Sequence, residues 1–439
     1  MSKRKKLLNL TRLAGLSLSL PLSILLPVNC VGYGAEPNRA DLSGAQSPKY
    51  QVDKQYCRQI LAKVDGKVRR EFYDLKKATT VWPAALAKMR PAIEASKSIQ
   101  DLADNINQAL AELHSSHCQF TTVNDDIFYF LHSLMGDFLR QEHHVKTPKI
   151  NFTGAITGGV NAKFNQIRYI LDYSPAQNAG LKIGDQIISV NGHPYIGQLS
   201  FAGCAMKVND LVVRRGEKTV KARLVVPLIE NYGEYVQAIR TSVRFESTEH
   251  GKIAYIHFWC GGSKAHEQFE EILSGADIHN TAGLILDLRD GYGAAYFDDL
   301  DFFYRPAKGY PLFGGRLRKR LSPYSYMFYD KPVVALINGG VRSGKELMAY
   351  SLKATGRARL VGEKTAGSVV GGRLFPLDDR TALYLAVSGP DPNGLNLEAV
   401  GVTPDVDVPI SLVQRGQKDL QLEKAKELLQ KTIMERSGP

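Results

Sequence analysis

The sequence predicts an α/β fold for the larger part of the chain. Three strongly apolar runs, 252–259, 281–290 and 331–339, have the length and composition of buried strands, and helical segments lie between or after them. Such an alternation is typical of an α/β layered fold. Further upstream, apolar residues recur at steps of four and three from 102 to 113, which predicts one face of a helix. A length of 439 residues allows about three domains.

Residues 1–35 predict a secretory signal peptide. Basic residues open "MSKRKKLLNLTRLAGLSLSLPLSILLP", and an apolar stretch interrupted by Pro21 and Pro27 follows them. Small residues suitable for cleavage lie near Gly34 and Ala35. We therefore expect an exported protein, either periplasmic or secreted. Membrane association through an uncleaved or lipidated signal is the open alternative.

Composition narrows the possible functions. With 44% hydrophobic and 23% charged residues the chain is an ordinary folded protein. The formal net charge of +12 includes five basic residues in the signal, and no pattern indicates nucleic-acid binding. No metal-ligating cluster is found, so we expect neither a metal nor an organic cofactor. Four cysteines follow the signal, and their spacing leaves the disulfide pairing open: Cys57, Cys118, Cys204 and Cys260.

A separate unit is expected at 146–235. A strand-like run is followed by a short helix that ends at Gly180, and then by a second strand that ends in an Asn-Gly turn. The segments "SPA", "AGL", "GD" and "VNG" between 174 and 192 resemble a PDZ domain of bacterial envelope proteases. Such domains bind a peptide tail by strand addition, and a loop receives the terminal carboxylate. By resemblance this loop comprises four residues, for which a plain turn is the alternative: Thr157, Gly158, Gly159 and Val160.

The candidate nucleophile is Ser343, within "GGVRSGKELMAYSL". Ser343 and Glu346 form the S-x-x-E signature of a capping box ahead of an apolar run, so a helix cap is the structural alternative. Glycine-bearing turns follow two of the predicted buried strands. If those strands end side by side, the amides of Gly293 and Gly344 can surround one carbonyl oxygen and form an oxyanion hole.

Four motifs resemble the tail-specific, or carboxyl-terminal-processing, protease family. They are "LILDLRDGYG", "PVVALINGGVRSGKELMAYSL", "RARLVGEKTAGSVVGG" and "LEAVGVTPDVDV", in the order and approximate spacing of that family. The resemblance implies a helical N-terminal region at 50–145 that carries a catalytic histidine, an inserted PDZ domain and a crotonase-like α/β protease core at 236–412. A C-terminal helix at 413–439 is expected to pack loosely. The implied activity is a serine endopeptidase that uses Ser343 to cleave polypeptides near their free C-terminal tails.

The general base departs from the family's commonest pattern. Many members carry a lysine shortly after their G-E-x-T motif, whereas Ser368 occupies that place here. The histidine-dependent branch, which is similar to the tricorn protease core, implies His117 as the base, with Ser116 and Glu398 orienting and polarising it. Imidazole can accept a proton at neutral pH. His114 is the alternative base, and a catalytically inactive, PDZ-containing peptide-binding scaffold is the alternative for the whole protein.

Two cations flank the candidate nucleophile, where the family usually has small neutral residues. Arg342 precedes Ser343 directly, and Lys345 follows it by two positions. Solvent exposure is the simplest expectation for both side chains. The alternatives are a preference for an acidic substrate or stabilisation of the oxyanion.

Overall fold

The computed structural model describes most of the chain after the predicted signal, namely residues 51–159, 162–294, 297–304, 310–311, 317–318, 328–389 and 396–437. The predicted signal peptide and Val160 of the predicted peptide-binding loop lie outside these ranges. None of the helices within them combines the length and apolarity needed to cross a bilayer. All four cysteines that follow the signal carry free thiols, which answers the question of their pairing.

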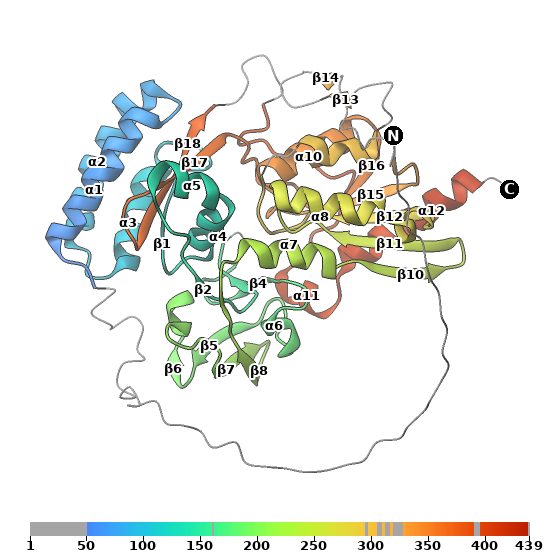
Figure 1. Cartoon of the computed structure of the whole chain (residues 1–439), viewed down its shortest axis with the longest axis horizontal. Coiled ribbons are helices and arrows are strands. Elements are labelled where there is room, and N and C mark those ends of the chain that lie inside the picture. Colours follow the sequence, from blue (N-terminus) through green and yellow to red (C-terminus); the bar gives the residue numbers. More distant parts are fainter. Residues whose placement is uncertain are drawn as a thin grey trace, which may run out of the picture. The chain divides into compact units, whose positions relative to one another are not determined.

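Three helices open the described chain and pack around one apolar core (Figure 1). Each begins at a capping side chain, and Ser98 and Asp101 form a full capping box at the third. A connection leads from the third helix to a strand that pairs with β18, almost 260 residues later, so the helical region shares its core with the C-terminal part of the chain. The elements are α1 (Lys54–Glu71), α2 (Leu75–Ala95), α3 (Ile99–Ala111), β1 (Gln119–Thr122), α4 (Asp126–Leu134), α5 (Gly136–His143), β17 (Gly371–Pro376) and β18 (Thr381–Ser388).

The middle of the chain is mostly antiparallel and has an apolar core of its own. Its four-stranded sheet has the order β6-β5-β7-β8, and β3 pairs with β4. The predicted Asn-Gly turn joins β5 to β6, with positive φ at both Asn191 and Gly192, as a type I′ hairpin requires. The elements are β2 (Ile150–Asn151), β3 (Ala155–Thr157), β4 (Ile167–Ile170), α6 (Pro175–Asn178), β5 (Gln186–Val190), β6 (His193–Pro194), η3 (Gln198–Phe201), β7 (Val208–Arg215), β8 (Lys218–Val225), β9 (Leu228–Ile229) and α7 (Tyr232–Thr241).

A six-stranded sheet of order β10-β11-β12-β15-β16-β19 forms the largest layer, and only its edge strand β10 is antiparallel. The three predicted apolar runs are β11, β12 and β15, so the mixed α/β class is confirmed. The elements are β10 (Arg244–Thr248), β11 (Gly251–His257), α8 (Ser263–Ser274), α9 (Ala276–His279), β12 (Gly283–Asp287), η4 (Phe297–Phe303), β13 (Tyr310–Pro311), β14 (Leu317–Arg318), β15 (Val333–Ile337), α10 (Gly344–Ala354), β16 (Ala358–Gly362), β19 (Val406–Asp407), α11 (Leu412–Gln417) and α12 (Leu420–Ser437).

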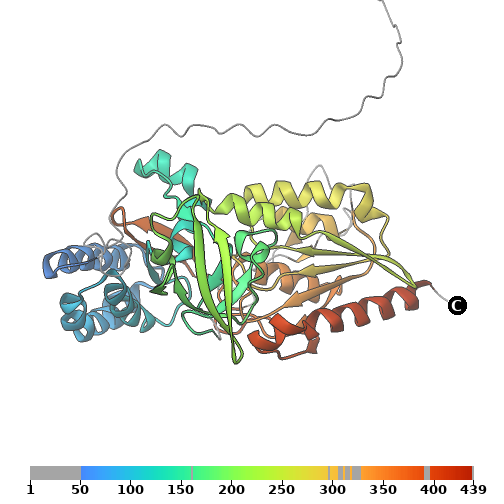
Figure 2. The ribbon, with the colours of Figure 1, turned by 90° about the horizontal axis from the view of Figure 1, so that it is seen from below.

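Helices cover both faces of this sheet, with α8 on one side and α12 on the other (Figure 2). Alternate residues of β12 face the two layers, because successive side chains of a strand point to opposite sides. The prediction that the C-terminal helix packs loosely is wrong, since Ala425 and Leu429 are fully buried against Ile285 and its neighbours. The predicted single helix is also divided, into α11 and α12.

The parallel arrangement decides where the two glycine-bearing turns lie. Strands β12 and β15 are adjacent and in register, with Asp287 opposite Leu336. Both strands run in the same direction, so the turns that follow them leave the sheet at the same edge. Gly293 and Ser343 therefore come together at this edge.

Candidate active site

Ser343 lies in a sharp turn between β15 and α10, with φ 55° and ψ −130°. A positive φ is rare for a residue with a Cβ atom, and holding it costs about 1–3 kcal/mol. The Ser343 amide donates to the carbonyl of Ser368 over 2.7 Å, which helps to hold this turn. Its hydroxyl makes no cap bond to the helix and no hydrogen bond to any other described residue, so it is available for chemistry.

Glu346, the other half of the predicted capping box, is fully buried, and its carboxylate is hydrogen-bonded to the loop at 365–368. Its carboxylate accepts hydrogen bonds from the amides of Gly367 (2.7 Å) and Ser368 (2.6 Å) and from the Thr365 hydroxyl. Burial raises the pKa of Glu346, and these donors oppose the rise. The structural alternative, a capping side chain at Ser343, is wrong because that side chain makes no cap bond, and Glu346 fixes the segment that receives the Ser343 amide.

Gly293 lies directly against the Ser343 turn. A Cβ atom added to Gly293 would stand 2.3 Å from the Arg342 carbonyl oxygen, 2.7 Å from Ser343 Cβ and 3.1 Å from the Gly344 nitrogen. Only glycine permits such a close approach of two backbones. Among the described residues, the amides of Gly293 and Gly344 have no acceptor, so both N–H groups stand free beside Ser343.

Ser116 and His117 lie on the connection between α3 and β1, where His117 also has a positive φ of 57°. The Ser116 hydroxyl is 2.9 Å from His117 Nδ1 and donates to Glu398 Oε2 over 3.0 Å. The Ser116 amide donates to Glu398 Oε1 over 2.8 Å, and the Val369 amide donates to Oε2 over 2.9 Å. The structure thus joins three of the predicted residues into one hydrogen-bonded chain across 282 positions of sequence.

The environment keeps the His117 imidazole neutral. Burial lowers its pKa from the ordinary 6.5 to about 4, the Glu398 carboxylate opposes this shift, and the Arg342 charge adds to it. The ring also lies 5.2 Å from that of Tyr384, measured between centroids. A neutral imidazole at pH 7 has an unprotonated nitrogen and can accept a proton. His114, the alternative base, is exposed and does not line the cavity that contains Ser343.

A cavity of about 390 Å³ brings the two halves together, because Ser343 and His117 both line it, as do Ser116, Gly293 and Tyr384. Within the described residues no hydrogen bond yet joins the Ser343 hydroxyl to the His117 ring. Catalytic hydrogen bonds are often longer in the absence of substrate and tighten when it binds.

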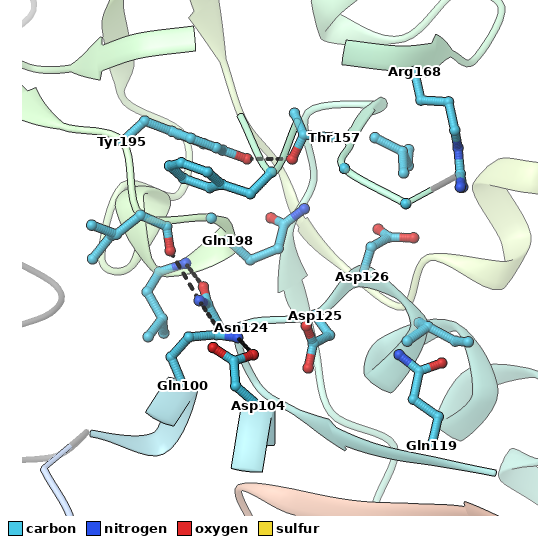
Figure 3. Close-up of a pocket in the computed structure, with 18 of the residues that line it drawn as sticks. Gln100, Asp104, Gln119, Asn124, Asp125, Asp126, Thr157, Arg168, Tyr195 and Gln198 are labelled. Carbon is cyan, nitrogen blue, oxygen red and sulfur yellow. Dashed lines mark hydrogen bonds between the residues drawn. The ribbon is translucent and has the colours of Figure 1, made fainter. Parts of the chain in front are cut away.

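A second, larger cavity of about 840 Å³ shares Tyr292, Arg342 and two other lining residues with the first. It extends to the predicted peptide-binding loop, of which Thr157, Gly158 and Gly159 line its wall. Figure 3 shows Thr157, Tyr195 and Arg168 on one side of this cavity and Asp104, Asp125 and Gln119 on the other. The cavity at the loop and the cavity at Ser343 are therefore neighbours, with Tyr292 and Arg342 in the wall of both.

The two flanking cations are not solvent-exposed, so that expectation is wrong. Lys345 is 1% exposed, its Nζ donates to the Asp290 carbonyl over 2.7 Å, and burial lowers its pKa to about 8. Arg342 lines both cavities, and its Nε atom is buried. Because the Lys345 amine is hydrogen-bonded to the Asp290 carbonyl, it is poorly placed to accept the proton of Ser343.

Sequence reasoning missed a buried network behind Gly293. The Tyr292 hydroxyl donates to Asp126 Oδ2 over 2.9 Å, and Tyr235 donates to the same oxygen over 2.9 Å. These three residues come from α4, α7 and the turn after β12. No sequence motif identifies these three residues, because they come from segments that are far apart in the chain. Their contacts fix the residue next to Gly293.

Comparisons with known proteins identify a family domain and several related proteases. Residues 252–408 match Peptidase family S41. A carboxyl-terminal-processing protease of Synechocystis sp. is 26% identical over 306 residues, which cover 64% of this chain and 70% of the relative. The tricorn protease of Thermoplasma volcanium is 29% identical over 240 residues, 51% of this chain and 22% of that protein.

Among solved structures, a photosystem II D1 C-terminal processing protease aligns with a TM-score of 0.49 at 18% identity, covering 80% of this chain and 93% of that one. Within the described residues, no group of acidic, cysteine or histidine side chains could hold a metal ion. The family match spans the strands that deliver Gly293 and Ser343 and extends through Glu398. Residues 252–408 therefore form a Peptidase family S41 domain, and the chain is similar to the carboxyl-terminal-processing proteases of that family, which are serine peptidases.

Proposed function

We propose that this protein is an exported serine endopeptidase that cleaves polypeptides near their C-terminal tails. Ser343 attacks the peptide carbonyl while neutral His117 takes the hydroxyl proton, and the proton then passes to the leaving amine. An acyl-enzyme results, which water activated by His117 hydrolyses. The observation that carries this proposal is the shared cavity, which Ser343, His117 and Gly293 line together.

Ser116 and Glu398 position the base in this mechanism. The Ser116 hydroxyl gives its single proton to Glu398 Oε2, so its oxygen is left to accept a hydrogen bond from His117 Nδ1. That bond favours the tautomer with the proton on Nδ1, which leaves Nε2 free to receive the proton of Ser343. The Glu398 charge then stabilises the imidazolium that forms.

The amides of Gly293 and Gly344 form the oxyanion hole. Both flank Ser343 and have no acceptor among the described residues, so a developing oxyanion can receive both N–H groups without displacing an existing bond. Removal of one such donor typically costs about 10²–10³-fold in kcat.

Residues 146–235 are proposed to form a PDZ domain inserted ahead of a crotonase-like core at 236–412. In this arrangement Thr157, Gly158 and Gly159, together with Val160, receive the carboxylate of the substrate tail. The support is the cavity that runs from this loop to Arg342, beside Ser343. Export to the periplasm or beyond the cell rests on the predicted signal at 1–35.

Labelling with a fluorophosphonate tests the mechanism, because this reagent reacts with activated serines. We expect the folded wild-type chain to be labelled, and Ser343→Ala and His117→Ala to lose the label. His114→Ala is the matched control for the histidine and should label normally. Folded wild-type protein that takes no label would contradict the proposal and favour the peptide-binding scaffold.

Cleavage of a polypeptide with a free or an amidated C-terminus tests the tail-binding step. We expect the free acid to be cleaved with the lower KM, because only its carboxylate can use the loop at 157–160. Equal KM values for the two substrates would remove this loop from the proposal while leaving the serine mechanism intact.

A further inference from the structure

Arg342 is a partly buried cation that has no anionic partner among the described residues. Its Nε atom is inaccessible to solvent and has no hydrogen-bond partner, and no ion pair joins Arg342 to any carboxylate of the described chain. Two other buried arginines, in contrast, form ion pairs with carboxylates. Arg289 pairs with Asp287 and Asp419, and Arg415 pairs with Asp290. Even partial burial of an unpaired charge has a desolvation cost, so a guanidinium in this state at a cavity wall is suited to bind an anion.

A second arginine adds to the positive field. Arg168 lines the same large cavity from β4, with its guanidinium against Gly159, and its Nε is also buried and has no hydrogen-bond partner among the described residues. Its carboxylate neighbour, Asp290, stands at 3.9 Å and is already bound to Arg415. Burial and the nearby Arg168 charge lower the pKa of Arg342, but a guanidinium stays protonated at any physiological pH.

None of the acids that line this cavity forms an ion pair with Arg342, and each carboxylate accepts hydrogen bonds from other groups. Asp126 accepts from two tyrosines and from Asn231, Asp125 accepts from the amide and hydroxyl of Thr122, and Asp104 accepts from Gln100 (Figure 3). The positive charge at the cavity wall therefore remains available to a ligand.

We propose that Arg342 determines specificity by binding a carboxylate of the substrate close to the scissile bond. Arg342 precedes Ser343 in the chain and lines both the cavity with His117 and the cavity that leads to Gly159, so a group bound to it lies beside the reacting carbonyl. A planar guanidinium binds a carboxylate through two parallel hydrogen bonds. The preferred substrates are then peptides with an acidic residue next to the cleaved bond, or with their C-terminal carboxylate there.

This inference rests on the proposed peptidase function and is tested with four peptides of one sequence. The residue next to the cleaved bond is Glu or Gln, and the C-terminus, placed two residues beyond that bond, is a free acid or an amide. The ratio of kcat/KM between charged and uncharged peptides is measured for wild type, Arg342→Gln and Arg342→Lys. A preference for Glu that Arg342→Gln abolishes identifies a side-chain carboxylate, and a preference for the free acid that Arg342→Gln abolishes identifies the terminal one.

We expect wild type to favour one carboxylate by about 10- to 100-fold, as loss of a hydrogen bond to a charged group implies. Arg342→Gln should bring the ratio close to one, and Arg342→Lys should retain part of it, because lysine keeps the charge but not the planar geometry. Arg223→Gln, at a solvent-exposed arginine of β8, is the matched control and should keep the wild-type ratio.

The uncharged fluorophosphonate separates the possible failures. A wild type that neither labels nor cleaves any of the peptides contradicts the proposed function itself. A wild type that cleaves all four equally, or an Arg342→Gln variant that labels normally and keeps the preference, overturns the role of Arg342. Equal loss of activity toward all four peptides in Arg342→Gln also overturns it, because that pattern belongs to oxyanion stabilisation.

Discussion

The turn that carries Ser343 and the turn that carries His117 share a left-handed backbone but differ in what holds them. Ser343 has φ 55° and His117 has φ 57°. The serine turn is built locally, by a buried strand, a helix start and a glycine from the neighbouring strand's turn. The histidine turn follows a helix of another region and depends on Glu398, 282 positions away from Ser116.

In the proposed mechanism, this difference means that the nucleophile and the base that activates it depend on different parts of the fold. A strand–turn–helix unit forms the serine turn wherever the core sheet folds. The histidine reaches the same cavity only if the α1–α3 region, β1 and the segment around Glu398 assemble together. Activity is therefore expected to be more sensitive than core stability to changes around His117.

The largest expected effect on activity comes from substituting Ser343 and His117, singly and together. Ser343→Ala and His117→Ala should each lower kcat/KM by about 10⁴-fold or more, and the double variant should be no worse than the worse single variant, because the residues act as one unit. Steady-state hydrolysis of one peptide measures all three. Ser263→Ala, at an exposed serine that also opens a helix, is the matched control. Additive losses would show that the turns act separately.

Gly293→Ala tests the close approach on the serine side. The added methyl group would overlap the Arg342 carbonyl and Ser343 Cβ, so the backbone must shift and the Gly293 amide must move. We expect kcat to fall by about 10²–10³-fold and the free energy of unfolding to fall by about 1–3 kcal/mol.

Gly233→Ala is the matched control for this substitution. Gly233 lies in α7, and an added Cβ there would meet no atom within 4 Å. It should stabilise the fold by about 0.5–1 kcal/mol and leave kcat unchanged. Normal turnover by Gly293→Ala would exclude this glycine from the oxyanion hole.

Glu398→Gln changes only the hydrogen-bonded chain that holds His117. We expect kcat to fall by about 10- to 100-fold, because Ser116 loses a charged acceptor while the imidazole remains. The pH profile distinguishes an electrostatic role from a structural one. Wild-type activity should fall on the acid side near pH 4, since His117 must be neutral to act. Without the Glu398 charge, which raises the pKa of His117, this acid limb should move to lower pH.

The lowered pKa of His117 also predicts how the free energy of unfolding depends on pH. The pKa of His117 is lower in the folded chain than the ordinary 6.5, so between about pH 6.5 and 4 protons bind the unfolded chain more readily. The contribution of His117 to folding is therefore lost as the pH falls through this window. Glu217→Gln, at an exposed glutamate in the β7–β8 turn, should change neither profile. An acid limb that stays in place in Glu398→Gln contradicts the electrostatic role.

The smallest expected effect concerns strain in the serine turn. Ser343→Gly and Ser343→Ala are both inactive in the proposed mechanism, but glycine adopts a positive φ without steric cost. We expect the glycine variant to be more stable than the alanine variant by about 1 kcal/mol, measured by chemical denaturation. An alanine variant as stable as the glycine variant would show that the turn stores no strain.

Local patterns in the sequence were enough to predict the α/β class, the three buried strands and the place of Ser343 at a helix start. They were enough because strand and helix periodicity arises from residues close together in the chain. The family resemblance added Ser116, His117 and Glu398, and the structure joins them by hydrogen bonds. The same local reading misjudged Glu346, whose carboxylate has partners about twenty positions away.

The tertiary structure alone decided which side chains lack a partner. Arg342 and Lys345 flank the same serine and look alike in the sequence. The Lys345 amine is bound to a backbone carbonyl, whereas the Arg342 guanidinium lies at a cavity wall and has no ion-pair partner among the described residues. The Tyr292–Asp126 contact and the burial of Leu429 likewise depend on elements distant in sequence. Burial and pairing are properties of the assembled surroundings, because the nearest charges and apolar surfaces come from segments that only folding brings together.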